Sequence, residues 1–409
     1  MRALIVATAC LTLAAPAAAE ASGFVEGDVK VLHTWHGAPG GYLGWAVSEL
    51  KDIDRDGVTD IISGEPYNGG GVTWVYSGRT GKQIYSFPGQ PGDLQGYAIA
   101  DAGDTNRDGV HDIISGAAGG SRAYLYSGKN GALLHTFQVT PGDALGGAVS
   151  SAGDQNYDGY DDVLVGAYSD DTTAPNAGAA YVFSGRTYKP LRKLYGTRQG
   201  ERYGSGVDST SGVRLPVLTT DLVIGAPGGT GAHVVSGLLG RDWFTLAPPP
   251  AAVNFGTFFV AGVGRVDGDR IPDLYAGDYG ASGGAGYAAV YSGRDGSIIH
   301  QWPGAPGDGR GPGREAGDVD HDGHVDLAVG SYTAGGPAQP GRLDIFSGAT
   351  GKLLRTITST TPNENLGFDA VTLGDVNHDG EPDLLLSAAE GDTMYLIAGR
   401  RCPRRGCGT

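Results

Sequence analysis

The chain has 409 residues, a length that suits two average domains or one large closed β architecture. Glycine contributes 73 residues, but 40% of the chain is apolar and the glycines recur periodically, which argues against a disordered chain. The formal net charge of −16 at pH 7 argues against nucleic acid and anionic membranes as partners.

Residues 1–21 are predicted to form a secretory signal peptide. Arg2 supplies the positive charge at its start, residues 3–15 form an apolar segment, and small residues at 17–21 offer a cleavage site. A membrane anchor is the alternative, but the apolar run is shorter than the about 20 residues that a spanning helix needs. No later stretch of the sequence is apolar enough to cross a bilayer. We therefore expect a secreted protein, periplasmic or extracellular, without membrane insertion.

One sequence unit recurs seven times within residues 22–400, which form a single predicted domain. Its marker is an aspartate followed by an apolar run and a small residue, and the markers are 50 to 59 residues apart. Each unit reads as four short strands, as in residues 43–47, 60–64 and 72–77 of the first copy and 132–137 of the second. Because such repeats are typical of propeller blades, the sequence predicts an all-β fold, a seven-bladed β-propeller of four-stranded antiparallel blades. The marker aspartates are Asp60, Asp112, Asp162, Asp221, Asp273, Asp326 and Asp383.

The two ends of the repeat region predict how the ring closes. The last repeat stops after its third strand, residues 394–397, whereas residues 29–35 resemble the fourth-strand segment 133–137. We therefore expect the N-terminal strand to complete the last blade, so that no unpaired sheet edge remains where the ends meet.

A nine-residue acidic loop precedes the marker aspartate and is complete in five repeats. Side chains at loop positions 1, 3, 5 and 9 and the carbonyl at position 7 offer the hard oxygens that Ca²⁺ prefers, and glycine at position 6 permits a tight turn. The sequence therefore predicts about five structural Ca²⁺ ions. The expected ligands are Asp52, Asp54, Asp56, Val58, Asp60, Asp104, Asn106, Asp108, Val110, Asp112, Asp154, Asn156, Asp158, Tyr160, Asp162, Asp318, Asp320, Asp322, His324, Asp326, Asp375, Asn377, Asp379, Glu381 and Asp383.

Other interpretations of these loops fit less well. An EF-hand needs a glutamate at position 12 between two helices, and Mg²⁺ demands stricter octahedral geometry. Solvated turns are the remaining alternative, but five copies with fixed spacing argue against them. The loop of the fourth repeat, residues 212–221, keeps only its last acid, so we expect no ion there. In the fifth repeat Arg265 and Arg270 replace the first aspartate and the glycine, and a guanidinium is expected to replace the cation beside Asp267 or Asp269.

The repeat resembles the FG-GAP repeat. The acidic loop is preceded by pairs such as Leu43-Gly44 or Phe255-Gly256 and is followed by Gly-Ala-Pro at residues 225–227 or by variants of it. FG-GAP repeats build the integrin α-subunit headpiece and many secreted bacterial proteins. The resemblance implies a calcium-binding propeller, whereas its members include adhesion receptors, lectin-like proteins and propellers attached to enzymes.

Four tyrosines are candidate ligand-binding residues. Tyr168, Tyr279 and Tyr332 stand six residues after their marker aspartates, and Tyr67 stands seven after its own. If the family arrangement holds, they lie opposite the acidic loops, where their rings are suited to stack on sugars or to anchor a protein loop. The alternative is that they pack against neighbouring loops and plug the mouth of the channel.

The sequence favours binding over catalysis, because it contains no zinc-protease motif, no serine-nucleophile motif and no cysteine nucleophile. We expect a monomeric binding or adhesion module for an extracellular carbohydrate or protein. Two alternatives stay open: a propeller enzyme acting on polysaccharide, as a lyase or hydrolase, and a structural scaffold in a secreted assembly. In the C-terminal tail, residues 401–409, Cys402 and Cys407 are expected to form a disulfide in an oxidising compartment.

Overall fold

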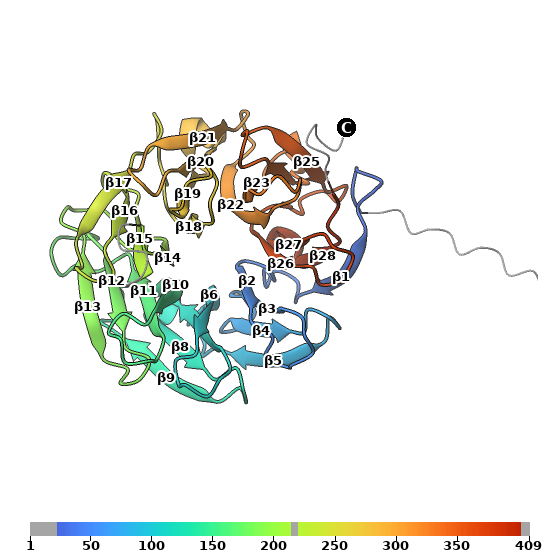
Figure 1. The fold of residues 1–409 in the computed structure, drawn as a ribbon. Coiled ribbons are helices and arrows are strands. Elements are labelled where there is room, and N and C mark those ends of the chain that lie inside the picture. Colours follow the sequence, from blue (N-terminus) through green and yellow to red (C-terminus); the bar gives the residue numbers. More distant parts are fainter. Residues whose placement is uncertain (1–22, 214–219, 402–409) are drawn as a thin grey trace, which may run out of the picture.

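A computed structural model describes residues 23–213 and 220–401 of the chain. These residues form seven four-stranded antiparallel sheets arranged around a central axis (Figure 1). The predicted seven-bladed β-propeller is therefore confirmed. The predicted signal peptide and the predicted disulfide between Cys402 and Cys407 lie outside the described residues.

Each blade takes four strands, numbered here from blade one (β2 to β5) to blade seven (β26 to β28 with β1). The first strand of a blade lies next to the axis and the fourth lies at the rim (Figure 1). The strands are β1 (Val31–His36), β2 (Val47–Leu50), β3 (Asp60–Glu65), β4 (Val72–Tyr76), β5 (Gln83–Pro88), β6 (Gln95–Gly103), β7 (Asp112–Ala117), β8 (Arg122–Tyr126), β9 (Leu133–Gln138), β10 (Leu145–Gly153), β11 (Asp162–Ala167), β12 (Ala179–Phe183), β13 (Pro190–Tyr195), β14 (Val207–Ser211), β15 (Thr220–Ala226), β16 (Gly231–Val235), β17 (Asp242–Leu246), β18 (Val260–Val263), β19 (Asp273–Asp278), β20 (Tyr287–Tyr291), β21 (Ile298–Pro303), β22 (Arg310–Gly317), β23 (Asp326–Ser331), β24 (Arg342–Phe346), β25 (Leu353–Thr358), β26 (Ala370–Gly374), β27 (Asp383–Ala388) and β28 (Thr393–Ile397).

Helical structure in the described ranges is confined to short segments after the second strands. They are η1 (Ala118–Gly120), α1 (Ala281–Gly284), η2 (Gly336–Ala338) and η3 (Ala389–Gly391). No helix among the described residues is long and apolar enough to cross a membrane.

The first strand of blade one begins later than the sequence predicts. Residues 43–47 were the expected strand, but β2 begins at Val47. Tyr42 and Gly44 both have left-handed backbone angles, with φ of 59° and 87°, which turn the chain before the strand starts. Leu43, only 1% exposed, is buried at the interface with blade seven instead of continuing a strand.

The N-terminal strand closes the ring as predicted. β1 pairs antiparallel with β28 (Figure 1). In this pairing Trp35 lies opposite Met394. The indole nitrogen of Trp35 donates to the carbonyl oxygen of Gly81 in blade one at 2.8 Å. Trp302 in the fourth strand of blade five makes the equivalent bond to Gly351 of blade six at 3.0 Å. β1 therefore contacts the next blade as an internal fourth strand does.

The hydrophobic core lies between the blades. Within the described part of the chain, seven clusters of buried apolar side chains each join two adjacent blades. Ile61 of β3 and Leu385 of β27, for example, share one cluster. Because both faces of each second strand are covered in this way, β3, β7 and β11 are buried along their whole length. This explains why the markers are continuous apolar runs and do not alternate with polar residues.

Glycines at the blade interfaces allow the backbones to approach closely. A Cβ atom at Gly64 would lie 1.9 Å from the carbonyl oxygen of Gly96 in the next blade, which no side chain can accommodate. The small residue that ends one marker therefore contacts a glycine at or just before the first strand of the next blade. In blade seven Ser387 takes this place, and its hydroxyl donates to the carbonyl oxygen of Gly44.

Candidate functional site

The acidic loops join the first and second strands of the blades at one end of the ring. Neighbouring loops contact each other there. The backbone N–H of Asp104 in blade two donates to Oδ2 of Asp161 in blade three at 2.8 Å. His321 of blade six lies 2.9 Å from the carboxylate of Glu381 in blade seven. Contacts of this kind place the loops of adjacent blades together at one strongly acidic end of the ring.

Each complete loop wraps around the carboxylate at its first position. In blade one, Asp52 accepts hydrogen bonds from the N–H groups of Asp56 and Gly57 at 3.0 and 2.7 Å. Arg55 and Gly57 turn the chain with φ of 64° and 89°. The other complete loops repeat the pattern, in which Asp104, Asp154, Asp318 and Asp375 accept the same pair of bonds. The sequence indicated the glycine turn, but not the left-handed residue two places before it.

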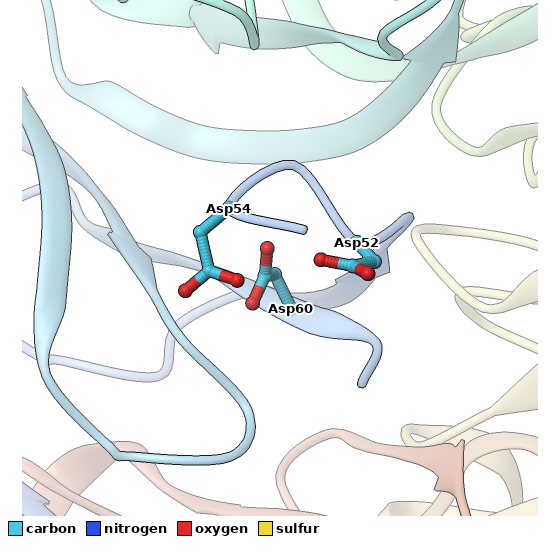
Figure 2. A group of neighbouring side chains, drawn as sticks. All are labelled: Asp52, Asp54 and Asp60. Atoms are coloured by element: carbon cyan, nitrogen blue, oxygen red, sulfur yellow. The ribbon is translucent and has the colours of Figure 1, made fainter. Parts of the chain in front are cut away.

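Three carboxylates converge inside the loop of blade one (Figure 2). Asp52, Asp54 and Asp60 each offer an oxygen, and these oxygens lie within 4.8 Å of one another. Asp60 is fully buried and accepts hydrogen bonds from the N–H groups of Ile53 and Gly78. Burial nevertheless raises the pKa of Asp60 to about 7. Crowded carboxylates, one of them fully buried, need a positive charge, so this donor set fits a hard divalent cation.

Blade six repeats this arrangement. Asp318, Asp320 and Asp326 form a second group of oxygens within 4.8 Å of one another. Burial raises the pKa of Asp326 to about 7, although the N–H groups of Val319 and Gly348 donate to it. Two loops that are distant in sequence thus build the same cluster from loop positions 1, 3 and 9.

An asparagine takes the third position in the loops of blades two, three and seven. The amide nitrogens of Asn106 and Asn377 donate to the marker aspartates Asp112 and Asp383, both at 3.1 Å. In the described structure Oδ1 of Asn106 is buried without a hydrogen-bond partner. A buried acceptor in this position fits a cation that would accept its lone pair.

The other predicted ligand positions are placed differently. Asp56, at position 5, lies outside the group of three carboxylates, and its Oδ2 accepts a bond from the hydroxyl of Ser77 at 3.2 Å. Val58, at position 7, donates its N–H to Asp56 at 3.0 Å. The same bond from position 7 to position 5 occurs at Val110, Tyr160, His324 and Glu381, which donate to Asp108, Asp158, Asp322 and Asp379.

The loop of blade five carries a guanidinium beside one of its carboxylates. Arg294 donates to Oδ2 of Asp269 through Nη2 at 2.8 Å and through Nε at 3.1 Å. This arginine comes from the turn after the third strand, whereas sequence reasoning pointed only to Arg265 and Arg270. The marker Asp273 stays fully buried, and burial raises its pKa to about 6.

The loop of blade four is only partly described, because residues 214–219 lie outside the described ranges. Its marker Asp221 accepts bonds from the N–H groups of Val213 at 2.8 Å and Gly237 at 3.0 Å. The marker therefore keeps the same backbone contacts in a repeat that lacks the other acids.

An aromatic collar lies at the opposite end of the ring. Each of its rings contacts the next, with centroid distances of 5.0 to 6.3 Å, and the last ring returns to the first. The collar lies over a cavity of about 300 Å³ whose lining includes Arg314, Asp208 and Asp369. Nε of Arg314 lies 3.4 Å from Oδ1 of Asp369. The collar residues are Trp45, Tyr97, Phe258, Phe259, Tyr279, Tyr332 and Phe368.

The four predicted tyrosines lie at or beside this collar. Tyr279 and Tyr332 belong to it, with their centroids 6.3 Å apart. Tyr67, 45% exposed, contacts Trp45 at 5.6 Å from outside the collar. Tyr168 is half-buried against Gly147, where an added Cβ would lie 2.4 Å from the ring. Burial raises the pKa of Tyr332 to about 12.

Sequence reasoning missed the remaining collar residues. Trp45, Tyr97 and Phe368 directly follow the glycine that begins their blades. The same position carries glycine, serine, threonine or proline in the other four blades. An aromatic residue immediately after this glycine was therefore the available signal.

Comparisons with known proteins agree with the repeat pattern over part of the chain. No protein-family model matches the chain. A stretch of 106 residues, 22% of this chain, is 36% identical to integrin alpha-3 of Cricetulus griseus and covers 10% of that protein. A stretch of 92 residues, 19% of this chain, is 37% identical to integrin alpha-3 of Mus musculus and covers 8% of it. The matched region thus spans a tenth or less of the length of these relatives.

Proposed function

We propose that this chain, an FG-GAP propeller of the integrin α type, is a secreted binding or adhesion module whose ligand is an extracellular carbohydrate or protein. Its collar end holds the ligand. Its acidic end binds about five structural Ca²⁺ ions. The resemblance to two integrin alpha-3 chains supports a binding role in general, and the choice of site rests on this chain's own residues.

The aromatic collar is the observation that carries the proposal. Protein ligand sites are concave, mostly apolar and equipped with a few polar groups, and the collar with its cavity has this composition. Tyrosine and tryptophan present a large apolar surface together with a polar tip, which suits both sugar rings and protein loops. Tyr279 and Tyr332 are among the residues that line this cavity.

The calcium ions have a structural role in this proposal. The loops that would hold them lie at the opposite end of the ring from the collar, so the ions brace the blades without touching the ligand. The converging carboxylates of Asp52, Asp54 and Asp60 support one such site, and Asp318, Asp320 and Asp326 support another.

An enzyme acting on polysaccharide is the principal alternative. Such an enzyme needs a group that moves a proton, which in most glycosidases is a carboxyl group. Asp208, Asp369 and Glu390 line the collar cavity, and Asp369 lies beside Arg314. The closed ring of aromatic side chains at this cavity favours binding. A scaffold role in a secreted assembly would leave the collar without a ligand of its own.

A binding screen tests the proposal. Panels of glycans and extracellular proteins are incubated with the parent chain and with a Tyr279→Ala/Tyr332→Ala variant, in calcium and in chelator. Each stacking contact contributes about 1 kcal/mol, so the double variant should bind a discovered ligand at least about tenfold more weakly.

The matched control is Tyr157→Ala, because Tyr157 is 56% exposed at the acidic end of the ring. This variant should bind as the parent does. A ligand that binds the double variant and the parent equally would show that the collar rings only pack together, and a screen without any ligand would refute the binding role.

A further inference from the structure

A second hollow, of about 350 Å³, lies between the loops of blades three, four and five. We call it the arginine groove, after Arg202, the only charged residue among the described residues that line it. Pro175 and Asn176 come from blade three, Gln199 and Arg202 from the connection into blade four, and Pro227 and Val253 from the next two loops. No collar residue lines this groove, so it is separate from the cavity under the collar.

The groove is positively charged in a strongly acidic chain. The sequence has 45 acidic and 29 basic residues, yet no carboxylate is among the described residues that line the groove. Arg202 is exposed, and its guanidinium takes part in no ion pair within the described part of the chain. A cation in this setting is free to meet a negative ligand.

Two carboxylates that neighbour groove residues in the sequence or by hydrogen bonding are engaged within their own turns. Glu201, the neighbour of Arg202, is buried, and its Oε2 accepts bonds from the N–H groups of Thr197 and Arg198 at 2.6 and 2.9 Å. Asp171 accepts a bond from the N–H of Asn176 at 2.6 Å. These contacts hold both carboxylates against the backbone of their own turns.

Backbone hydrogen bonds hold the groove walls together. The N–H of Gly200 donates to Pro175, the N–H of Arg202 donates to Asn176, and the N–H of Gly228 donates to Glu201, at 2.9 to 3.1 Å. These three peptide N–H groups are therefore paired within the protein, and the side chains of Asn176, Gln199 and Arg202 offer further polar groups. A preformed groove of this kind does not have to order itself when it binds.

The groove borders the collar. The N–H of Val253, in the groove wall, donates to Oδ2 of Asp278 at 2.7 Å, and Asp278 directly precedes the collar residue Tyr279. Burial raises the pKa of Tyr168 and Tyr279, and Arg202 acts in the opposite direction on both. The guanidinium thus lies within electrostatic reach of two tyrosines on the ligand face.

We propose that the arginine groove binds the carboxylate of an acidic sugar unit, so that the ligand of this module is a uronate-containing polysaccharide. Arg202 forms the paired, charge-assisted hydrogen bonds that a carboxylate accepts. The side-chain amides of Asn176 and Gln199 donate to and accept from the sugar hydroxyls. The inference rests on the proposed binding function and adds the chemical class of the ligand.

A sugar fits the groove better than an acidic peptide does. A peptide brings backbone N–H and C=O groups that need partners, and the groove's own N–H groups at Gly200, Arg202 and Gly228 are already paired. A sugar brings hydroxyl groups, which the amides of Asn176 and Gln199 match, and an apolar ring face, which Pro175 and Pro227 can contact.

Calorimetry of the full chain at constant free calcium tests the assignment. The probes are trigalacturonate, the same trisaccharide with its carboxylates reduced to alcohols, and triglutamate. We expect trigalacturonate to bind, and the Arg202→Ala variant to bind it at least about tenfold more weakly, because hydrogen bonds to charged groups are the strong ones. Arg202→Lys should restore part of the loss. The matched control Arg198→Ala removes an exposed arginine outside the groove and should bind as the parent does.

Three outcomes overturn the proposal: no binding of trigalacturonate up to about 10 mM, equal binding by the parent and Arg202→Ala, or equal binding of the reduced trisaccharide. Triglutamate binding as tightly as trigalacturonate overturns the assignment to a sugar. A ligand that needs Tyr332 but not Arg202 refutes the groove and leaves the collar function standing. Conversely, trigalacturonate binding that needs Arg202 but not Tyr332 retains the groove and refutes the collar.

Discussion

The acidic loops of blades one and five occupy the same place in the repeat but neutralise their charge differently. In blade one, the carboxylates at positions 1, 3 and 9 converge, and Arg79 lies beside Asp56 at position 5, with its Nε 3.6 Å from Oδ1. In blade five, Arg265 replaces the first aspartate and Arg294 donates two hydrogen bonds to Asp269. The marker aspartates Asp60 and Asp273 are fully buried in both. The comparison indicates that the repeat needs its buried marker aspartate, whereas either a metal cation or a guanidinium can neutralise the charge of the remaining acids.

Of the changes that test this comparison, removal of divalent cations should have the largest effect on the stability of the folded chain. An ion at about 1,000 times its dissociation constant stabilises the folded chain by about 4 kcal/mol, and five loops resemble that of blade one. Chelation should therefore lower the melting temperature sharply, and Ca²⁺ titration should restore it with saturation near five ions. A melting curve that does not respond to chelator would contradict a structural role for calcium.

Loss of a single first-position ligand should have the next largest effect. Asp318→Ala in blade six removes one of three converging carboxylates. We expect one ion fewer per chain by elemental analysis, and a loss of calcium-dependent stability of up to about 4 kcal/mol. Arg265→Ala, at the same position in blade five, is the matched control and should leave the ion count unchanged. Equal ion loss in both variants would refute the distinction between the two kinds of loop.

A gain of calcium binding is expected when the loop of blade five is converted to a complete acidic loop. The double change Arg265→Asp/Arg270→Gly restores the first acid and the glycine turn that the complete loops share. The ion count should rise by one, with an affinity below that of the native sites because Arg294 still competes for Asp269. Arg270→Gly alone lacks the first acid and should bind no additional ion.

Loss of the guanidinium in blade five should have the smallest effect. Arg294 and Asp269 form an ion pair in which the arginine side chain is 64% exposed, and exposed pairs contribute little to stability. Arg294→Ala should lower the melting temperature slightly, by the same amount with calcium and with chelator, and Arg294→Lys should lower it less. A loss that appears only in chelator would show that this loop binds an ion after all.

The sequence was sufficient to predict the ring because the repeat encodes contacts that recur in every blade. The marker aspartates begin the second strands, with Asp221 one residue inside β15, and the small residue after each apolar run meets the glycine of the next blade, as at Gly64 and Gly96. The N-terminal strand was recognisable because it copies an internal fourth strand, including Trp35, which donates to a carbonyl oxygen of the next blade as Trp302 does.

The collar could not be predicted from the sequence because it does not repeat. The arginine of blade five does have counterparts, Arg79 and Arg186, after the third strands of blades one and three, and the sequence analysis missed that signal. Phe258 contacts Tyr97 at 5.7 Å, although 161 positions separate these two residues in the sequence. Arg294 reaches Asp269 from a position 25 residues away. Contacts across the axis leave no periodic signal, so only the folded ring brings the collar residues together.

The closing strand also determines when the ring can be completed during synthesis. Val31 pairs with Ile397, so the last sheet cannot be completed until residue 397 has been synthesised. Until then β1 is a lone strand without a sheet. Once β28 has formed, β28 is the free edge of the last sheet and can pair with any copy of β1. Pairings between distant segments form slowly, and open edges attract strands from other chains. Two nascent or partly unfolded copies can therefore exchange their first strands, each sealing the other's ring, by the same hydrogen bonds that seal a single one.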